Sequence, residues 1–448
     1  MDDSVNKIIK EINRFISYYG AKSACDFFEK KILECKNDEL CIWFASNIKN
    51  ADVLKHGKVV IENGVAANNY LFAKTIFEAD IKAHEKVVLD SGDTEYDYLF
   101  AKNIDEADVK AHGKVVIDSK DANYNFLFPC DIEGADVKAH EKVILDSKNL
   151  EYIFMFADLI SGADVKKLGE AIIASKDLKY NYDFANEVEC ADIAGHEKVI
   201  LDSGNTDYCY MFARDIEGAN IKAHEGVLLK SIDAYQCFNF AKDIEGADVK
   251  KLGDVVINSK NAIYNYMFAR DIEGADLKAH EKVVLDSGSA KFNYMFARDI
   301  EGADINAHEK VVLDSKDATY NYMFARDIEG ADLKAHEKVV LDSKEATYNY
   351  MFARDIHSAD IKAHEKVVLD SGDAELNYEF ASNINDSDIG AHREIVNRSG
   401  DSMYISLFDD FICERFDNDY IAKVDLSNTI NGMLEQCISK SKVKKKIK

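Results

Sequence analysis

Proline is almost missing from this sequence: its 448 residues include one, Pro129. Strand-rich folds punctuate their many turns with proline, so this scarcity disfavours an all-β fold. Long apolar runs are missing too, because no stretch approaches the roughly 18 consecutive apolar residues of a membrane helix. The first residues, MDDSVNKIIKEINRF, carry acids and no apolar core, so they do not read as a secretory signal. We therefore expect no membrane segment and no contact with a membrane.

The cysteines lack the pairing that disulfides or metal sites use. There are nine, with no CxxC pair and no fixed spacing. An odd, scattered set is typical of a reducing compartment, which predicts a cytoplasmic location. Cys41, Cys209 and Cys237 share one position of a sequence repeat, where Asn is usual, so we interpret them as neutral substitutions.

Basic residues are outnumbered: 82 acids face 56 bases, and the net charge is −26. A surface that binds duplex DNA is basic, so direct nucleic-acid binding by this chain is disfavoured. The exception is the end of the chain, where residues 440–448 include six lysines. We interpret this segment as a basic, solubilising tail.

What the sequence does have is a strict repeat. A phenylalanine recurs every 28 residues without insertion or deletion, at Phe44, Phe72, Phe100, Phe128, Phe156, Phe184, Phe212, Phe240, Phe268, Phe296, Phe324, Phe352, Phe380 and Phe408. A fixed period between about 20 and 50 residues is the signature of a tandem array, in which each repeat buries its apolar face only against its neighbours.

Each repeat contains two helical patterns. Residues 317–344, DATYNYMFARDIEGADLKAHEKVVLDSK, serve as the template. The first half has an apolar stripe with helical spacing, formed by Tyr320, Phe324 and Ile328. The second half has another, formed by Leu333, His336, Val340 and Ser343. Apolar residues at this spacing indicate amphipathic helices, here named helix A and helix B.

Residues that begin and end helices stand between these patterns. Asp317 and Asp332 are placed to cap helix A and helix B, and Gly330 gives the turn between them a permissive backbone. Pro129 breaks the rule, because it falls well inside a helix A. Since proline removes a backbone hydrogen bond, we expect a kink or a shortened helix there.

These observations predict an all-α fold, a right-handed α-solenoid of thirteen helix-turn-helix repeats over residues 37–400. Residues 1–36 are predicted to form an N-terminal helical cap with helices at 4–18 and 23–35. Residues 401–439 keep Phe408 and Ile412 but lose the turn and the histidine, which is typical of a terminal cap, and they include a predicted helix at 426–439.

The plan resembles the αα-solenoid class that includes tetratricopeptide, Sel1-like and HEAT repeats, over about residues 37–428. The resemblance lies in the architecture, because the tetratricopeptide pattern of Trp, Gly, Tyr and Pro is absent and this repeat is shorter. The unit YxYMFARDIEGADxKAHEKVVLDS also resembles uncharacterised tandem repeats of bacterial and viral proteins. The class implies binding of a protein partner along an elongated curved surface.

A histidine occupies one position of helix B in eleven repeats, at His56, His84, His112, His140, His196, His224, His280, His308, His336, His364 and His392. Leu168 and Leu252 take its place in two others. Equivalent residues of stacked helices lie about 10 Å apart, too far to share one zinc ion. We therefore predict packing histidines hydrogen-bonded to a neighbouring repeat, with His336→Leu tolerated, and no metal site.

We recognise no catalytic motif in the sequence. The run that begins His336-Glu337 superficially matches HExxH, but the fifth residue, Val340, cannot bind zinc. Neighbouring repeats at 289–316 and 317–344 are identical at 23 of 28 positions, which leaves no singular pocket there. We therefore expect no catalytic residues, no cofactor and no enzyme activity.

The candidate contact surface combines arginine and tyrosine, which are common interface anchors. One position of helix A is variable along the chain but stays cationic from Arg214 to Arg354. Tyrosines recur in pairs beside it, and we expect one of each pair to be core and the other to present its hydroxyl. The candidate partner-binding residues are Arg214, Arg270, Arg298, Arg326, Arg354, Tyr266, Tyr322 and Tyr350.

Two functions remain open from the sequence. The first is a non-enzymatic scaffold that binds a protein partner, whose identity the sequence does not give, nor does it give the oligomeric state. The alternative is an acidic mimic of DNA that occupies the basic groove of a nucleic-acid-binding protein, because the template repeat carries a net charge of −2. Surplus acid also keeps a long rod in solution, and this simpler interpretation is favoured over mimicry.

Overall fold

The computed structural model describes residues 3–415. This part of the chain is helical, without a strand, as predicted, and comprises 29 helices. Within it, no helix is both long enough and apolar enough to cross a membrane. The predicted helix at 426–439 and the basic tail at 440–448 lie outside the described residues.

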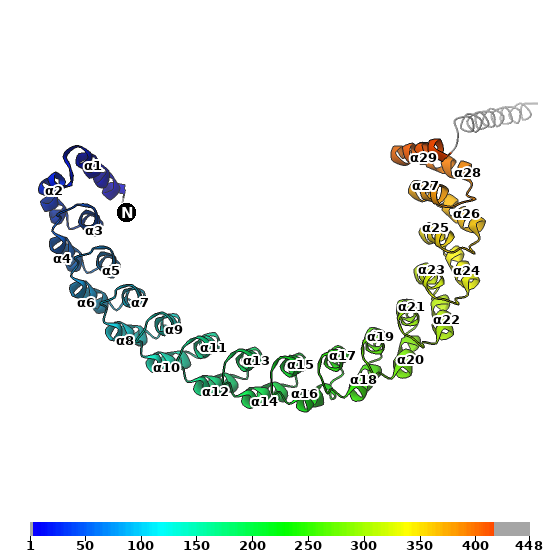
Figure 1. Ribbon diagram of the computed structural model, residues 1–448, viewed down its shortest axis with the longest axis horizontal. Helices are drawn as coiled ribbons and strands as arrows, with labels where there is room; N and C mark the ends of the chain where they lie inside the picture. The colour runs from blue at the N-terminus through cyan, green and yellow to red at the C-terminus, as the bar shows by residue number, and fades with distance from the viewer. Residues whose placement is uncertain (1–2, 416–448) are drawn as a thin grey trace, which may run out of the picture. The chain divides into compact units, whose positions relative to one another are not determined.

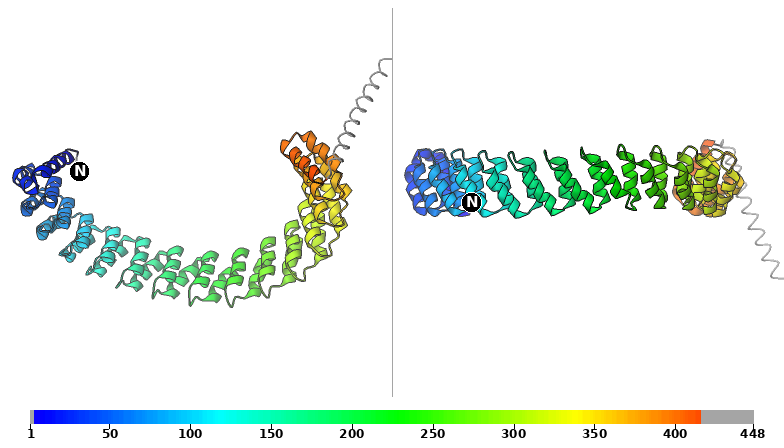
Figure 2. Two further views of the ribbon diagram at one scale, coloured as in Figure 1. Left: turned by 45° about the horizontal axis from the view of Figure 1, so that its top comes forward. Right: turned by 90° about the horizontal axis from the view of Figure 1, so that it is seen from below.

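The chain forms two compact parts, Met1–Val227 and Leu228–Lys448, here called the N-terminal half and the C-terminal half. In each half, helices A and B alternate, and each A helix packs beside the next A helix (Figures 1 and 2). The B helices contact one another in the same way, so that each half has a layer of A helices and a layer of B helices. The tandem arrangement of helix pairs is confirmed, whereas the count of thirteen repeats stays a prediction.

The A helices carry odd numbers. They are α3 (Asp38–Asn47), α5 (Ala66–Thr75), α7 (Thr94–Asn103), α9 (Ala122–Asp131), α11 (Leu150–Leu159), α13 (Leu178–Glu187), α15 (Thr206–Asp215), α17 (Ala234–Asp243), α19 (Ala262–Asp271), α21 (Ala290–Asp299), α23 (Ala318–Asp327), α25 (Ala346–Asp355) and α27 (Ala374–Asn383).

The B helices carry even numbers. They are α4 (Val53–Asn63), α6 (Ile81–Ser91), α8 (Val109–Ser119), α10 (Val137–Ser147), α12 (Val165–Ser175), α14 (Ile193–Ser203), α16 (Ile221–Leu228), α18 (Val249–Asn258), α20 (Leu277–Asp286), α22 (Ile305–Ser315), α24 (Leu333–Ser343), α26 (Ile361–Ser371) and α28 (Ile389–Ser399).

Helices outside this alternation stand at both ends of the described chain. The N-terminal pair is α1 (Asp3–Tyr19) and α2 (Ala21–Cys35), close to the bounds predicted from the sequence. At the other end, α29 (Ser402–Arg415) buries Phe408 and Ile412 in a cluster with Ala381 and Val396.

The predicted capping residues are confirmed. Asp317 accepts hydrogen bonds from the backbone N–H groups of Thr319 and Tyr320, and Asp332 accepts one from Ala335. Gly330 has φ 85°, a left-handed conformation that costs a glycine little. Local chemistry therefore sets where each helix begins and where the chain turns.

Pro129 does not shorten its helix. Helix α9 has 10 residues, as α7 and α11 have, and Pro129 lies inside it. Of the two expected consequences, the shortened helix is therefore wrong, and the kink stays a prediction. Because a proline in the last turn removes only its own N–H from the hydrogen-bond ladder, packing of Phe126 and Phe128 holds this short helix together.

The core consists of overlapping clusters that cross from one repeat to the next. Phe324 of α23 packs with Tyr294 and Ala297 of α21 and with Val312 of α22. The next cluster combines Tyr322 of α23 with Phe352 of α25 in the same way. Each repeat thus supplies half of two clusters and has no complete core of its own.

We predict that Phe324→Ala will destabilise the C-terminal half by about 3–5 kcal/mol, as truncation of a large core side chain does. Phe324 is 0% exposed, and its loss uncovers side chains of the preceding repeat. Urea unfolding followed by circular dichroism measures the change. Phe77→Ala is the matched control, because Phe77 is 96% exposed and its removal should cost less than about 0.5 kcal/mol. A loss below about 1 kcal/mol for Phe324→Ala would show that this side chain is not core.

Candidate interaction surface and buried histidine row

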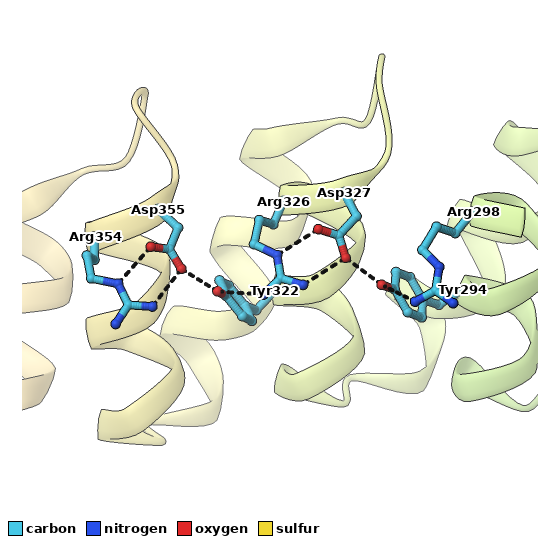
Figure 3. Close-up of polar contacts among 7 residues, drawn as sticks. All are labelled: Tyr294, Arg298, Tyr322, Arg326, Asp327, Arg354 and Asp355. Carbon is cyan, nitrogen blue, oxygen red and sulfur yellow. Dashed lines mark hydrogen bonds and ion pairs between the residues drawn. The ribbon is translucent and has the colours of Figure 1, made fainter.

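A chain of polar contacts joins the ends of successive A helices in the C-terminal half (Figure 3). It is here named the Arg–Asp row and consists of Arg270, Asp271, Arg298, Asp299, Arg326, Asp327, Arg354 and Asp355. In each pair, the arginine precedes its aspartate at the last turn of an A helix.

Within one repeat, the arginine guanidinium binds the carboxylate of the next residue through two of its nitrogens. Arg326 donates from Nε to Oδ1 of Asp327 at 2.7 Å and from Nη2 to Oδ2 at 2.9 Å. Its Nη1 donates to the hydroxyl of Tyr322 at 3.1 Å. The guanidinium of Arg326 therefore lowers the pKa of Asp327 below its ordinary value.

Tyrosine hydroxyls connect the Arg–Asp pairs of successive repeats. Tyr294 of α21 donates to Oδ2 of Asp327 on α23 at 2.5 Å, and Tyr322 of α23 donates to Asp355 on α25. Asp299, Asp327 and Asp355 are thereby each held by their own arginine and by the tyrosine of the preceding repeat, as Figure 3 shows for Asp327 and Asp355. The row is a continuous hydrogen-bonded network, half exposed to solvent.

The tyrosines chosen from the sequence are not exposed anchors. Tyr266, Tyr322 and Tyr350 are 2%, 1% and 3% exposed, so the expectation that they present a contact surface is wrong. The half-buried member of each pair is the other one, such as Tyr320, whose ring lies 6.2 Å from that of Tyr294. The reason is that helix A packs against its own helix B and against two neighbouring A helices, which buries more than one stripe.

The arginines chosen from the sequence lie together as expected in the C-terminal half. The Arg326 side chain is 38% exposed and that of Asp327 is 23% exposed. Arg214 forms the same pair with Asp215 in the N-terminal half, where Tyr182 donates to that carboxylate. Lys102 takes the place of the arginine near Asp131 and Tyr98.

The eleven repeat histidines are fully buried, and nine of them contact an Asn, or Asp97 at His112, of the same repeat through Nδ1. His336 of α24 contacts Oδ1 of Asn321 on α23 through Nδ1 at 2.8 Å, and its ring stacks on Phe324. Asn321 donates from Nδ2 to the carbonyl of Val312 at 2.9 Å and to that of Asp317 at 2.8 Å. Since both amide hydrogens are used, Oδ1 is the acceptor and Nδ1 of His336 carries a hydrogen.

A glutamate from the preceding repeat reaches the other ring nitrogen. Oε1 of Glu309 on α22 lies 3.2 Å from Nε2 of His336 and accepts the backbone N–H of Asp332 at 2.6 Å. With Nδ1 already a donor, the contact at Nε2 becomes a hydrogen bond to Glu309 only when that nitrogen also carries a hydrogen. Burial lowers the pKa of His336, and the charge of Glu309 opposes that shift.

Glu309 stands at the same repeat position as Glu337 of the HExxH-like run, and we predicted no role for it from the sequence. It joins a helix B to the capping residue of the next helix B, so it couples repeats. Within residues 3–415, no group of three or more His, Cys, Asp or Glu is placed to hold a metal ion.

An apolar pocket in the N-terminal helix pair was also missed. A cavity of about 660 Å³ opens between α1 and α2, lined by Ile8, Phe15, Phe28 and Ile32 among others. Tyr18 and Phe27 beside it are largely exposed. The signal in the sequence was a group of aromatic residues that falls outside the repeat period.

Comparison with known proteins adds little. The sequence matches no protein-family model and no curated protein. A solved structure that matches this chain is that of a protective antigen of uropathogenic Escherichia coli strains, described as displaying an SLR fold, that is, a Sel1-like repeat fold. The two chains share 10% identity over 89% of this chain and 92% of the other, with a TM-score of 0.21.

The structure changes our expectation for His336→Leu. We now predict that this substitution costs about 1–3 kcal/mol, because it leaves the buried Oδ1 of Asn321 without a donor. The double variant His336→Leu/Asn321→Ile should recover most of the loss, as Leu168 stands opposite Ile153 in its own repeat. Ser315 still donates to the carbonyl of Val312, so that group keeps a partner. A double-mutant cycle in urea measures the coupling, and additive losses would contradict the pairing.

We also predict a loss of stability in mild acid. Burial lowers the pKa of His84, His140, His196 and His280 to about 4, from 6.5 in the unfolded chain. Between these values the unfolded chain binds more protons, so stability is full above pH 6.5 and falls as the pH drops towards 4. Each of these histidines contributes on the order of 3 kcal/mol across that interval.

Urea unfolding at a series of pH values tests this dependence. The matched variant is His280→Leu/Asn265→Ile, which removes one of these histidines with its partner. Its stability should change less steeply between pH 6.5 and 4 than that of the parent chain. Equal slopes for variant and parent would contradict a neutral, buried His280.

Proposed function

We propose that the chain is a non-enzymatic, cytoplasmic repeat scaffold that binds a protein partner along the layer of A helices in its C-terminal half. The observation that carries the proposal is the Arg–Asp row, a periodic set of half-exposed arginines held in fixed positions by aspartate and tyrosine. Repeat proteins commonly present such regular surfaces to extended partners.

The arginines retain binding capacity. A guanidinium has five N–H donors, and Arg326 uses three of them within the row. The other two are free for a partner's carboxylate or backbone carbonyl. Equivalent arginines follow one another at the spacing of packed helices, about 10 Å, which suits a partner with regularly placed acceptors.

The mixed charge of the row favours a scaffold over a mimic of DNA. Asp299, Asp327 and Asp355 each accept from an arginine and from a tyrosine, so the row does not present an acidic ridge. The acidic mimic remains a candidate only through other carboxylates, such as Glu329, which lies outside the row.

We predict that replacing Arg270, Arg298, Arg326 and Arg354 together by Ala weakens partner binding at least tenfold, about 1.4 kcal/mol. The partner is first captured by the purified chain from host lysate and identified by mass spectrometry, and the affinity of the purified pair is then measured by calorimetry. Circular dichroism verifies that the helix content of the variant is unchanged.

The matched control replaces Tyr266, Tyr294, Tyr322 and Tyr350 by Phe. This variant loses the hydrogen bonds across the row but keeps every guanidinium, so binding should fall much less than in the Arg variant. Unchanged affinity in the Arg variant would contradict the proposal. If Asp327→Asn/Glu329→Gln with the same changes in adjacent repeats abolishes binding and duplex DNA competes for the partner, the mimic is favoured instead.

A further inference from the structure

Four repeats lack the glutamate that reaches the histidine of the next repeat. Glycine stands in its place at Gly57, Gly113, Gly169 and Gly253. In the following repeat of each, Nε2 of the fully buried histidine has no hydrogen-bond partner, at His84, His140, His196 and His280. Nε2 of His112, His364 and His392 also lacks a hydrogen bond, but a glutamate oxygen lies 3.3–3.4 Å from it. Repeats of the same backbone structure therefore occur both with and without a glutamate carboxylate at this position.

The space left by the missing glutamate side chain is well defined at Gly253, in the C-terminal half. A cavity of about 180 Å³ lies between α18 and α20, lined by Gly253, Phe268, Asp276 and His280 among others. A Cβ atom on Gly253 would stand 3.4 Å from Nε2 of His280, so this nitrogen faces the place that a side chain would fill. The volume exceeds the roughly 30 Å³ share of one water molecule several-fold.

The cavity offers one acceptor and one donor. Asn265 donates to the carbonyls of Val256 and Asn261, so its Oδ1 accepts from Nδ1 of His280, which leaves Nε2 as a bare acceptor. The donor is the backbone N–H of Asp276, for which the described residues hold no acceptor. Its counterpart Asp304 donates to Glu281 at 2.6 Å.

A carboxyl group satisfies both atoms at once. Its hydroxyl hydrogen meets Nε2, and its carbonyl oxygen accepts from the backbone N–H. In the complete repeats a single oxygen, Oε1 of Glu281, lies beside both Nε2 of His308 and the backbone N–H of Asp304. A carboxylate ion achieves the same contacts by taking up one proton from solvent. Asp254 and Asp276 face the cavity together with Lys250, and the two carboxylates favour this uptake.

We propose that the cavity at Gly253 is a binding site for a short monocarboxylic acid, which replaces the missing glutamate side chain between His280 and the backbone N–H of Asp276. Acetate corresponds to the Cγ and carboxyl atoms of that side chain. The site lies between B helices, so it is independent of the Arg–Asp row and of the proposed function. Binding takes up one proton per acid bound as the anion.

Acetate titration of the full chain with isotope-labelled histidine tests the proposal. The readout is the ring resonance of His280, assigned by its loss in His280→Leu/Asn265→Ile. Above pH 5 the apparent affinity for acetate should weaken about tenfold for each pH unit, because one proton is taken up. Acetamide has the same shape with its own donor and acceptor, so it should shift the resonance with little pH dependence.

Two variants serve as controls. Gly253→Glu supplies the carboxylate covalently and should abolish the response of His280 to acetate. Glu309→Gly should create a new response at His336, which the parent chain lacks. Methanesulfonate, an anion that is not protonated in this range, should shift neither resonance.

The outcomes divide clearly. A response to acetate that grows as the pH falls, disappears in Gly253→Glu and appears at His336 in Glu309→Gly supports the site. A cavity filled by water only would show no response to acetate or acetamide, and this overturns the proposal. An equal response to methanesulfonate, or one that persists in Gly253→Glu, overturns it as well.

Discussion

The hydrogen bond between a buried histidine and an asparagine is the constraint on which the repeat depends. In the template repeat, His336 is bound to Asn321, and Asn321 also holds the carbonyl of Val312 in the preceding repeat. One side chain therefore fixes helix A against its own helix B and against the previous one. An apolar contact of the same area tolerates sliding, whereas this set of donors and acceptors is satisfied in a single register.

The exceptions show that the two residues form one element. Leu168 stands opposite Ile153, so both polar groups are missing together, and Leu252 stands opposite Cys237. His112 meets Asp97 instead of asparagine, and burial raises the pKa of that carboxyl group. In two repeats a cysteine stands opposite the histidine, at His56 and His224, and the buried Nδ1 has no hydrogen-bond partner, so the pairing is common along the array but not universal.

Local patterns were enough to predict the helices and their caps at Asp317 and Asp332, because these depend on neighbours within one repeat. Phe324 and His336 were predicted to be buried because both lie on apolar stripes of the sequence. The exposure of Tyr322 was predicted wrongly, since a single apolar stripe does not reveal how many neighbours a helix has. The role of Glu309 was missed for a related reason: its contacts with Asp332 and His336 lie in the next repeat, 23 and 27 residues ahead. Comparison of His positions with Asn and Glu positions along the array would have found both partners.

Hydrogen bonds also link the Arg–Asp row to the core. Tyr322 is a core ring whose hydroxyl reaches Asp355 of the next repeat, and Asp355 in turn holds Arg354. The exposed guanidinium is therefore fixed before any partner arrives. Because ordering flexible side chains is one of the main costs of association, a surface built this way loses little conformational entropy when it binds. The network that aligns the repeats thus also fixes the arginines in place, which is what the proposed binding surface requires.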